Sequence, residues 1–376
     1  MSRKVFRRIG LGLVVVLAAA AAAGGVWLAT LPGAPTGPNP EPVPQAEVDA
    51  TLAALAPPKR ERPLVAVVGI NDTTEVTDYL VPYGILHHAD VADVVALATE
   101  PGPVTLYPAL RVEPQQTVAD FDAAHPDGAD YVVVPRMSRD DDPVVLDWLR
   151  AQHAKGAIVI GVCAGAKVVA ASGLLDGRRA TTHWYFVDEL RELEPNVEYV
   201  PDRRFVVDRG VATTTGITAS MPAMLTLIEA IAGRERAAAV AAELGVTSWD
   251  ARHDSAAFVF NRPFALTIVR NTTAFWNDDR LGIELTDGID EVSLALVADA
   301  WSRTYRSQAV SFADGPVVSR GGLQVLPEEQ SAPGDLLSID DRPPAQRLAS
   351  TLDEIAGAYG DATADVVVTE LEYPRG

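Results

Sequence analysis

The sequence predicts an α/β fold with a mostly parallel sheet, and three features support this. Residues 63–70 (PLVAVVGI), 130–137 (DYVVVPRM) and 157–162 (AIVIGV) are continuous apolar runs, typical of strands buried on both faces. Segments with helical periodicity separate these runs, for example residues 142–156 (DPVVLDWLRAQHAKG). Strands that alternate with helices favour a parallel sheet covered by helices on both faces.

Length and composition bound the function classes. The chain has 376 residues, so we expect about two domains. A hydrophobic content of 48% is enough to bury real cores. The net charge of −20 repels phosphate groups and argues against a nucleic-acid partner. The single cysteine excludes an intramolecular disulfide, and no Cys/His pattern has the spacing of a zinc site.

Residues 1–30 are expected to form a signal anchor, that is, a transmembrane helix. Residues 1–8 are basic and carry no acid, and residues 9–30 (IGLGLVVVLAAAAAAGGVWLAT) are uncharged. Such a run is long enough to cross a bilayer core of about 30 Å. The preceding basic residues predict a cytoplasmic N-terminus and an extracytoplasmic body. A cleaved signal peptide, which would release a secreted protein, is the alternative.

The proline-rich residues 31–62 are expected to be an extended linker.

Cys163, the only cysteine, lies between a predicted strand and a predicted helix. Gly161 and Gly165 flank it and permit a tight bend with a close backbone approach. Functional sites of open α/β sheets gather at the carboxyl ends of strands. The N-terminus of the following helix should lower the pKa of the thiol. We therefore predict a nucleophile elbow that carries sulfur; the alternative is a small buried core residue.

Two segments resemble the DJ-1/PfpI (ThiJ/PfpI) superfamily of the class I glutamine amidotransferase-like fold. They are residues 161–184 (GVCAGAKVVAASGLLDGRRATTHW) and 206–233 (VVDRGVATTTGITASMPAMLTLIEAIAG). Within that superfamily they look closest to the amidase-like domain of AraC-type regulators and to isonitrile hydratases. The resemblance implies a flavodoxin-like three-layer sandwich over residues 63–234. It also implies a cysteine nucleophile at Cys163, an acid from the first strand–helix connection, dimerisation and no cofactor.

The resemblance suggests which groups assist the thiol. Asp78 lies four residues before Pro82, which matches the acid-x-x-x-Pro spacing of the family, and Glu75 is the other candidate. Such a carboxyl group can hydrogen-bond the sulfur or transfer protons, although Asp78 could equally be a first-turn helix acid. His183, in the motif TTHW, is the candidate imidazole, with a structural role as its alternative. The adjacent histidines 87 and 88 are interpreted as surface residues.

The sequence departs from the family at two positions near the elbow. Many members place Gly-Gly after the strand equivalent to residues 130–135, as part of an oxyanion hole, where this chain has Arg136 and Met137. Isonitrile hydratases usually have Thr after the cysteine, where this chain has Ala164. Backbone amides at Arg136, Met137 and around the elbow, including Ala164 and Gly165, remain candidates for oxyanion contacts.

Residues 235–376 are expected to be a second α/β region that contains a degenerate half-repeat. Residues 102–114 (GPVTLYPALRVEP) parallel 315–327 (GPVVSRGGLQVLP), and 73–86 parallel 288–301. Residues 127–137 parallel 361–371, so the copy spans about residues 281–372. The copy has no cysteine, and no acid stands at the position equivalent to Asp78. We therefore expect a packing role, in which the half-copy replaces a homodimer partner. The consecutive His253, Asp254 and Ser255 are interpreted as a loop.

These observations favour a membrane-anchored hydrolase or hydratase that uses Cys163 on a small molecule with a C–N or carbonyl group. The competing hypothesis is a non-catalytic ligand-binding or redox-sensing module, in which the same thiol is oxidised. The predicted partners are a small molecule and the membrane, with no nucleic acid, metal or cofactor.

Overall fold

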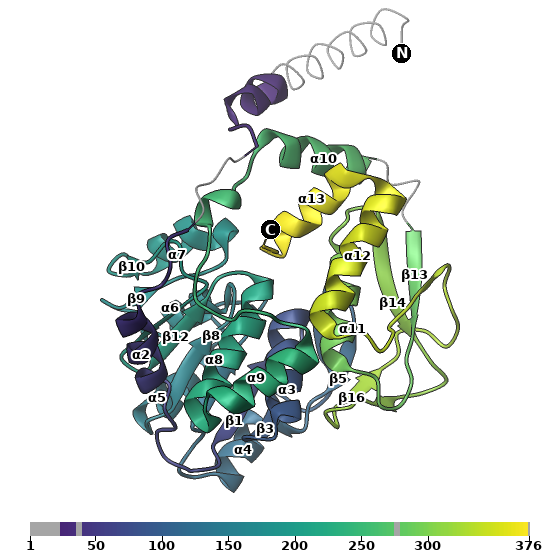
Figure 1. Cartoon of the computed structure of the whole chain (residues 1–376). Helices are drawn as coiled ribbons and strands as arrows, with labels where there is room; N and C mark the ends of the chain where they lie inside the picture. Colours follow the sequence, from purple (N-terminus) through teal and green to yellow (C-terminus); the bar gives the residue numbers. More distant parts are fainter. Residues whose placement is uncertain (1–22, 35–39, 274–278, 375–376) are drawn as a thin grey trace, which may run out of the picture.

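The computed structural model describes residues 23–34, 40–273 and 279–374 (Figure 1). Its main sheet has, among these residues, seven strands in the order β11-β12-β8-β7-β1-β3-β6. All neighbouring strands are parallel except β11 and β12. The strands are β1 (Leu64–Gly69), β3 (Asp93–Ala98), β6 (Gln116–Thr117), β7 (Tyr131–Val134), β8 (Ile158–Gly161), β11 (Phe205–Asp208) and β12 (Val211–Thr214).

Helices cover both faces of this sheet, as the residues of β1 show. Val65 and Val67 belong to one core cluster, whereas Ala66 and Val68 belong to the other. Side chains alternate between faces along a strand, so each cluster lies on its own side of the sheet. The first side carries α3 (Val76–Ala89), α8 (Ser220–Ala232) and α9 (Arg234–Leu244), and the second carries α4 (Val118–Ala124), α5 (Pro143–Ala154) and α6 (Gly165–Ala171). The predicted α/β sandwich with a mostly parallel sheet is confirmed.

The turn between β8 and α6 depends on Gly165. A Cβ atom at this position would overlap the carbonyl oxygen of Val134 at the end of β7, so no other residue fits without movement of the backbone. This close approach packs the start of α6 directly against the carboxyl end of the neighbouring strand. Gly161, at the end of β8, is less restricted, because its Cβ would lie 3.0 Å from the backbone of Ala166.

The C-terminal part repeats the element order of the first half. A three-stranded sheet, β14-β13-β17, consists of β13 (Asp279–Glu284), β14 (Ser307–Phe312) and β17 (Leu336–Leu337), and all its pairs are parallel. Between β13 and β14 lies α11 (Glu291–Ser302), as α3 lies between β1 and β3. The chain then continues through α12 (Pro344–Tyr359) and α13 (Asp361–Glu370).

The two halves meet around a local twofold axis. Helices α3 and α11 pack against each other, and β5 (Arg111–Glu113) pairs antiparallel with β16 (Gln324–Leu326). The central pair of that ladder is Val112 with Val325, which are equivalent positions of the sequence repeat. Pairing between equivalent positions is what a symmetric interface between two copies produces. The same sheet contains β2 (Thr74–Glu75), β4 (Val104–Tyr107) and β15 (Val317–Val318).

One part of the predicted repeat is wrong. Residues 361–371, paired in the sequence with the strand at 130–137, form the helix α13. Its buried residues Thr363, Ala364, Val366 and Val367 follow helical spacing, and Gly360 with φ 88° starts the helix. The place beside β13 that corresponds to β7 beside β1 is occupied by β17 instead.

The predicted surface position of His88 is also wrong, because α11 covers that end of α3. The His88 ring is largely buried, and its Nε2 lies 2.9 Å from the Glu291 carboxylate, whereas His87 is exposed.

The remaining elements are α2 (Gln45–Ala54), α7 (Val187–Leu193), α10 (Arg262–Thr273), β9 (Arg179–Ala180) and β10 (Glu198–Tyr199). Helix α2, within the expected linker, packs on α8 and β11.

Most of the predicted anchor, residues 1–22, lies outside the described residues. Residues 23–30 are helical and project from the body above α10 (Figure 1). Within the described part of the chain, no helix has the length and apolar character needed to cross a bilayer.

We expect the full chain to be a monomer, because the α3 face and the β5 edge are already covered by α11 and β16 of the same chain. Native mass spectrometry of the full chain in detergent should give the mass of one chain. A tight dimer that buries α3 against a second copy would contradict the local twofold arrangement.

Replacement of Gly165 by Ala should destabilise the fold by about 3 kcal/mol or more, because the added methyl group overlaps the β7 backbone. Gly357→Ala is the matched control: Gly357 is an exposed residue of α12 with open space around its Cβ position. That substitution should stabilise the helix by about 1 kcal/mol. Thermal unfolding of both variants measures the contrast, and equal unfolding midpoints would show that β7 can move to accommodate a side chain.

Candidate functional site

Cys163 lies on a strained turn between β8 and α6. Its φ is 55°, in the left-handed region that residues other than glycine rarely adopt, and it is 2% exposed. Two threonines hold the backbone there: Cys163 N donates to Thr214 Oγ1 at 3.0 Å, and Thr182 Oγ1 donates to the Cys163 carbonyl oxygen at 3.0 Å. The strand–turn–helix geometry is that of a nucleophile elbow.

The environment of the thiol opposes ionisation. Burial raises the pKa of Cys163 well above its usual range, and the carboxyl groups of Asp78 and Glu75 act in the same direction. The Ala164 amide donates a hydrogen bond to the sulfur and thereby lowers the pKa of Cys163, but this effect is smaller than that of burial. The prediction of an acidic thiol is therefore not supported, because burial and the neighbouring carboxyl groups both disfavour the thiolate.

Asp78 is fully buried near the start of α3, and one of its oxygens has no partner. The amide of Arg136 donates to Asp78 Oδ2 at 3.1 Å, whereas Oδ1 has no hydrogen-bond partner among the described residues. Burial raises the pKa of Asp78 well above its usual value, and the charge of Glu75 adds to this effect. The neutral acid is thus favoured, and a proton on Oδ1 would give this buried oxygen a hydrogen to donate.

The candidate oxyanion donors are largely engaged elsewhere. The Arg136 amide bonds Asp78, and the Ala164 amide bonds the sulfur. Met137 pairs with Thr74 in an isolated bridge, and its side chain packs in the core on the α5–α6 side of the sheet. The guanidinium of Arg136, in contrast, lies in the cavity wall beside Cys163. Positive charge for a developing anion therefore comes from a side chain and not from a pair of free amides.

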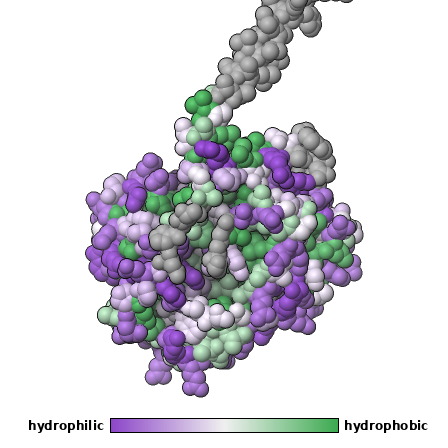
Figure 2. All heavy atoms as spheres, turned by 45° about the horizontal axis from the view of Figure 1, so that its top comes forward, coloured by the Kyte–Doolittle hydropathy of each residue, from purple (hydrophilic) through white to green (hydrophobic). Residues whose placement is uncertain are grey.

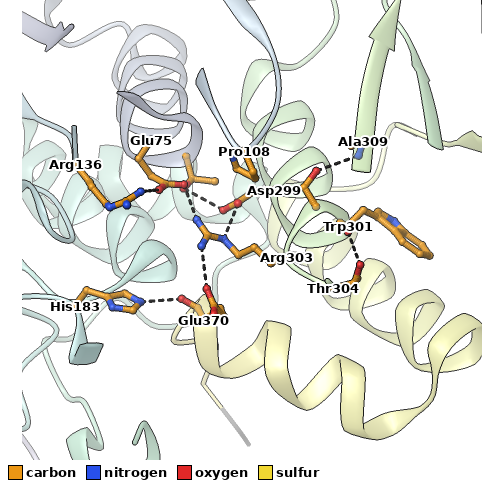
Figure 3. Close-up of polar contacts among 12 residues, drawn as sticks. Glu75, Pro108, Arg136, His183, Asp299, Trp301, Arg303, Thr304, Ala309 and Glu370 are labelled. Atoms are coloured by element: carbon orange, nitrogen blue, oxygen red, sulfur yellow. Dashed lines mark hydrogen bonds and ion pairs between the residues drawn. The ribbon is translucent and has the colours of Figure 1, made fainter. Parts of the chain in front are cut away.

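Glu75, the alternative acid, joins two arginines beneath the cavity (Figure 3). Its Oε2 lies 3.0 Å from Arg136, and its Oε1 lies 2.6 Å from Arg303 of the C-terminal half. The structure thus places the two candidate acids in different environments: Asp78 is buried and favours the neutral form, whereas Glu75 contacts two arginine side chains.

The C-terminal half contributes residues that the sequence analysis missed. Arg303, which follows α11, bonds Asp299 at 2.6 Å and Glu370 at 3.1 Å in addition to Glu75. Tyr305 donates to Glu370 at 2.9 Å. Burial raises the pKa of Asp299 to about 7, and Arg303 opposes this shift. The sequence contains one indication of this contact: Asp299 and Arg303 have i,i+4 spacing at the end of a mostly apolar helix.

His183 lines the same cavity as Cys163, but both of its ring nitrogens have other partners. Nδ1 accepts the amide hydrogen of Tyr185 at 3.2 Å, so Nε2 carries the hydrogen and donates to the Glu370 carbonyl oxygen at 2.9 Å. The predicted activation of the thiol by this imidazole is not supported by these contacts. His183 instead fixes the end of α13 against the elbow domain (Figure 3).

The loop residue His253 is buried and contacts the C-terminal segment. Its Nε2 lies 3.2 Å from Glu372 Oε2, and the Trp184 amide donates to Glu372 Oε1 at 2.6 Å. Burial acts to raise the pKa of Glu372, but His253 and the Trp184 amide outweigh it and hold the pKa below its usual value. This pair joins the C-terminus to the residues beside His183. Neighbouring Asp254 and Ser255 do not line the cavity.

These groups surround a cavity of about 300 Å³ with a polar floor and an aromatic wall. Cys163, Glu75, Arg136, Arg303 and Glu370 form the polar part. The aromatic and apolar part consists of Tyr107, Trp184, Tyr185, Phe186, Ile217, Phe260, Phe264 and Ile268. In the described part of the chain, no group of three or more His, Cys, Asp and Glu side chains has the arrangement of a metal site.

Asp78→Asn should change how stability depends on pH. Because the folded pKa of Asp78 is raised above the unfolded value near 3.8, the wild type loses stability as pH rises from that value towards the folded pKa. Asn keeps the bond from Arg136 and does not ionise. The advantage of the variant should therefore grow by about 1.4 kcal/mol per pH unit. Urea unfolding from pH 4 to 7 measures this, and a constant difference would mean that Asp78 is ionised in the fold.

Comparison with known proteins identifies the family. The model of the DJ-1/PfpI family matches residues 65–230. Isonitrile hydratase of Pseudomonas putida is 34% identical over 168 residues, which are 43% of this chain and 70% of the hydratase. The HTH-type transcriptional regulator CdhR of Pseudomonas aeruginosa is 39% identical over 98 residues, 26% of this chain and 29% of the regulator. The match covers less than a third of that regulator, and the absence of a nucleic-acid partner stays a prediction for this chain.

Solved structures give matches of the same kind. DJ-1beta of Drosophila melanogaster has a TM-score of 0.45 at 23% identity and covers 50% of this chain and all of its own. A ThiJ/PfpI family protein from Pseudomonas syringae has a TM-score of 0.45 at 21% identity and covers 50% of this chain and 76% of its own. From the family match and the 34% identity to the hydratase, we conclude that the chain belongs to the DJ-1/PfpI family.

Proposed function

We propose that this protein is a cysteine-dependent hydratase or hydrolase of a small molecule that contains an electrophilic C–N or carbonyl carbon. One observation carries the proposal: the Cys163 elbow faces a cavity of about 300 Å³, and the buried Asp78, which favours its neutral form, lies close enough to influence the thiol. A nucleophile with a buried, neutral carboxylic acid close behind it is suited to addition with proton transfer. The similarity to an isonitrile hydratase supports this class of reaction.

The reaction would proceed by covalent addition. The sulfur bonds to the electrophilic carbon while the Asp78 carboxyl group gives its proton to the substrate heteroatom and takes the proton of the thiol. With a nitrile or isocyanide a C=N bond remains, and water then adds to the same carbon. With an amide the C–N bond breaks first, the amine leaves with the proton supplied by Asp78, and water then adds to the carbon of the resulting thioester. The C–S bond breaks, the proton returns to sulfur, and the hydrated product leaves with the thiol regenerated. Because Asp78 gains and loses one proton in each step, a high pKa suits its role, and the thiol need not be ionised beforehand.

Arg136 and Arg303 supply positive charge on the floor of the cavity. Arg136 lies against the rings of Tyr107 and Phe186, at 5.5 and 5.7 Å from their centroids. Arg303 is fixed by three carboxyl groups and keeps its charge. Negative charge that develops on the substrate heteroatom is stabilised by such fixed cations when water is excluded.

The proposal includes anchoring in a membrane by residues 9–30. The uncharged run behind a basic N-terminus supports an anchor with the body outside the cytoplasm. Cleavage of the run would instead give a secreted body. Detection of the intact N-terminus by mass spectrometry of the membrane fraction distinguishes the two.

A second candidate is a non-catalytic ligand-binding or redox-sensing module. The observation in favour of a non-catalytic role is that both nitrogens of His183 are engaged and that burial raises the pKa of Cys163. The raised pKa favours ligand binding over oxidation, because the thiolate is the form that is oxidised. The similarity to transcriptional regulators is consistent with a ligand-binding role for the domain. In this role, Cys163 would bind a ligand reversibly or be oxidised to sulfenic or sulfinic acid.

Cys163→Ala should abolish turnover, by at least a hundredfold, because no other cysteine can form the covalent bond. The assay is product formation from a panel of small isocyanides, nitriles, amides and aldehydes.

Asp78→Asn should keep binding and lower kcat by at least tenfold, because the proton donor is lost.

Thermal unfolding of the same variants serves as the folding control. Turnover that survives in Cys163→Ala would contradict covalent catalysis. No turnover by the wild type, together with rapid formation of sulfinic acid at Cys163 in dilute peroxide, would favour the redox candidate.

A further inference from the structure

Helix α10 carries an unpartnered apolar face next to the N-terminal helix. Phe264 and Ala265 are buried, whereas Leu266 and Val269 on the opposite side are 47% and 53% exposed. Arg262 and Arg270, at i−4 and i+4 from Leu266, flank this outward face and are exposed. A helix with exposed apolar residues between basic ones has the pattern of an interfacial membrane helix.

The end of the N-terminal helix continues the same surface. Val26 is 68% exposed and Trp27 is 50% exposed. Figure 2 shows hydrophobic residues gathered where this segment meets the body. We call Val26, Trp27, Leu266 and Val269 the apical patch. Isolated apolar residues on a surface are ordinary. An exposed apolar patch that adjoins an uncharged run of 22 residues, in contrast, indicates an interaction surface.

Hydrogen bonds fix the N-terminal segment to α10. The Arg262 side chain donates to the carbonyl oxygens of Leu28, Ala29 and Leu31 at 3.0, 3.0 and 3.2 Å. The Arg262 amide donates to the Pro32 carbonyl oxygen at 2.9 Å. These contacts cap the C-terminal end of the helix with a cation. A helix that enters a bilayer would therefore hold α10 at a set distance from the lipid.

A chain of aromatic contacts runs from this helix into the cavity. Ring centroids of Trp27 and Phe260 are 6.0 Å apart, those of Phe260 and Phe264 are 5.4 Å apart, and those of Phe264 and Trp184 are 5.7 Å apart. Phe260, Phe264 and Trp184 line the cavity of Cys163. The aromatic wall of the cavity is thus continuous with the apical patch.

We propose that the apical patch lies on the bilayer surface and that the cavity receives a lipophilic, uncharged substrate from the lipid side. This inference rests on the proposed chemistry of Cys163 and on the proposed anchor. The lipid bilayer is the occupant because the uncharged run 9–30 leads directly into the patch, and Trp27 with the flanking arginines matches the preference of these residues for the interface.

The placement is tested by depth-dependent quenching. The full chain with Cys163→Ser receives one new cysteine, by Leu266→Cys or Val269→Cys, labelled with a fluorophore and reconstituted in phosphatidylcholine vesicles. Val144→Cys on α5 and Leu336→Cys on β17, which are 47% and 61% exposed, are matched controls away from the patch. Lipid with a nitroxide near the headgroup should quench the labels at 266 and 269 at least threefold more strongly than the control labels. Equal quenching at all four positions would overturn the proposal.

The route of the substrate is tested separately with thiol reagents on the wild-type chain in vesicles. A long-chain alkyl maleimide should modify Cys163 at least tenfold faster than a sulfonated maleimide, each rate being normalised to that of a lipid-anchored cysteine peptide. Leu266→Glu combined with Val269→Glu, which leaves the cavity lining intact, should reduce this preference. A preference for the sulfonated reagent would overturn the route.

The two tests fail in distinguishable ways. Turnover that is lost in Cys163→Ala, together with equal normalised rates for the two maleimides, would overturn the lipid route and leave the proposed chemistry of Cys163 standing. Turnover that survives in Cys163→Ala would contradict that chemistry and remove the lipid route with it. The quenching result then still decides where the patch lies.

Discussion

The site depends on one buried cation that joins the two halves of the chain. Arg303 comes from the C-terminal half and contacts Glu75 at the start of α3, Asp299 one turn earlier and Glu370 at the end of α13. Burial alone would lower the pKa of Arg303, but these carboxyl groups outweigh it. Removal of the guanidinium would leave several carboxyl groups close together in a dry environment, which is costly. The floor of the cavity and the interface between the halves are thus the same set of interactions.

The same interface shows how the two copies have diverged. At one end of the α3–α11 pair, Glu75 contacts Arg303, and at the other end Glu291, which follows the residue equivalent to Glu75, contacts His88. The polar contact between a helix start and a helix end is therefore kept twice, while the cysteine elbow is present once. Glu291 also accepts the Gly321 amide at 2.9 Å, at the position equivalent to Pro108 in the first copy. The second copy has kept the packing contacts, whereas the first copy has kept both the packing contacts and the cysteine elbow.

The sequence was sufficient for features encoded by local pattern. Apolar runs identified β1, β7 and β8, two glycines around one cysteine identified the elbow, and spacing to a proline identified Asp78. The repeat identified α11 and β16. The contact of Arg303 with Glu75 and that of His183 with Glu370 join residues 228 and 187 positions apart, so no local pattern encodes them. Only the i,i+4 spacing of Asp299 and Arg303 is visible in the sequence. The pKa of Cys163 could not be predicted either, because it depends on how deeply the tertiary fold buries the sulfur. Residues 361–371 were misread because a short valine run fits a strand and a buried helix equally well.

The covalent link between the halves has a kinetic and genetic consequence. When a site is completed by a separate subunit of a homodimer, dilution dissociates the dimer and leaves the site incomplete. Every substitution at the interface then also appears on both sides of the twofold axis. Here the residues that complete the cavity belong to the same polypeptide as the cysteine. Their effective concentration does not depend on expression level. Each side of the axis can also accept changes that its counterpart does not receive, so Arg303 and Glu370 can change without a matching change in the first half.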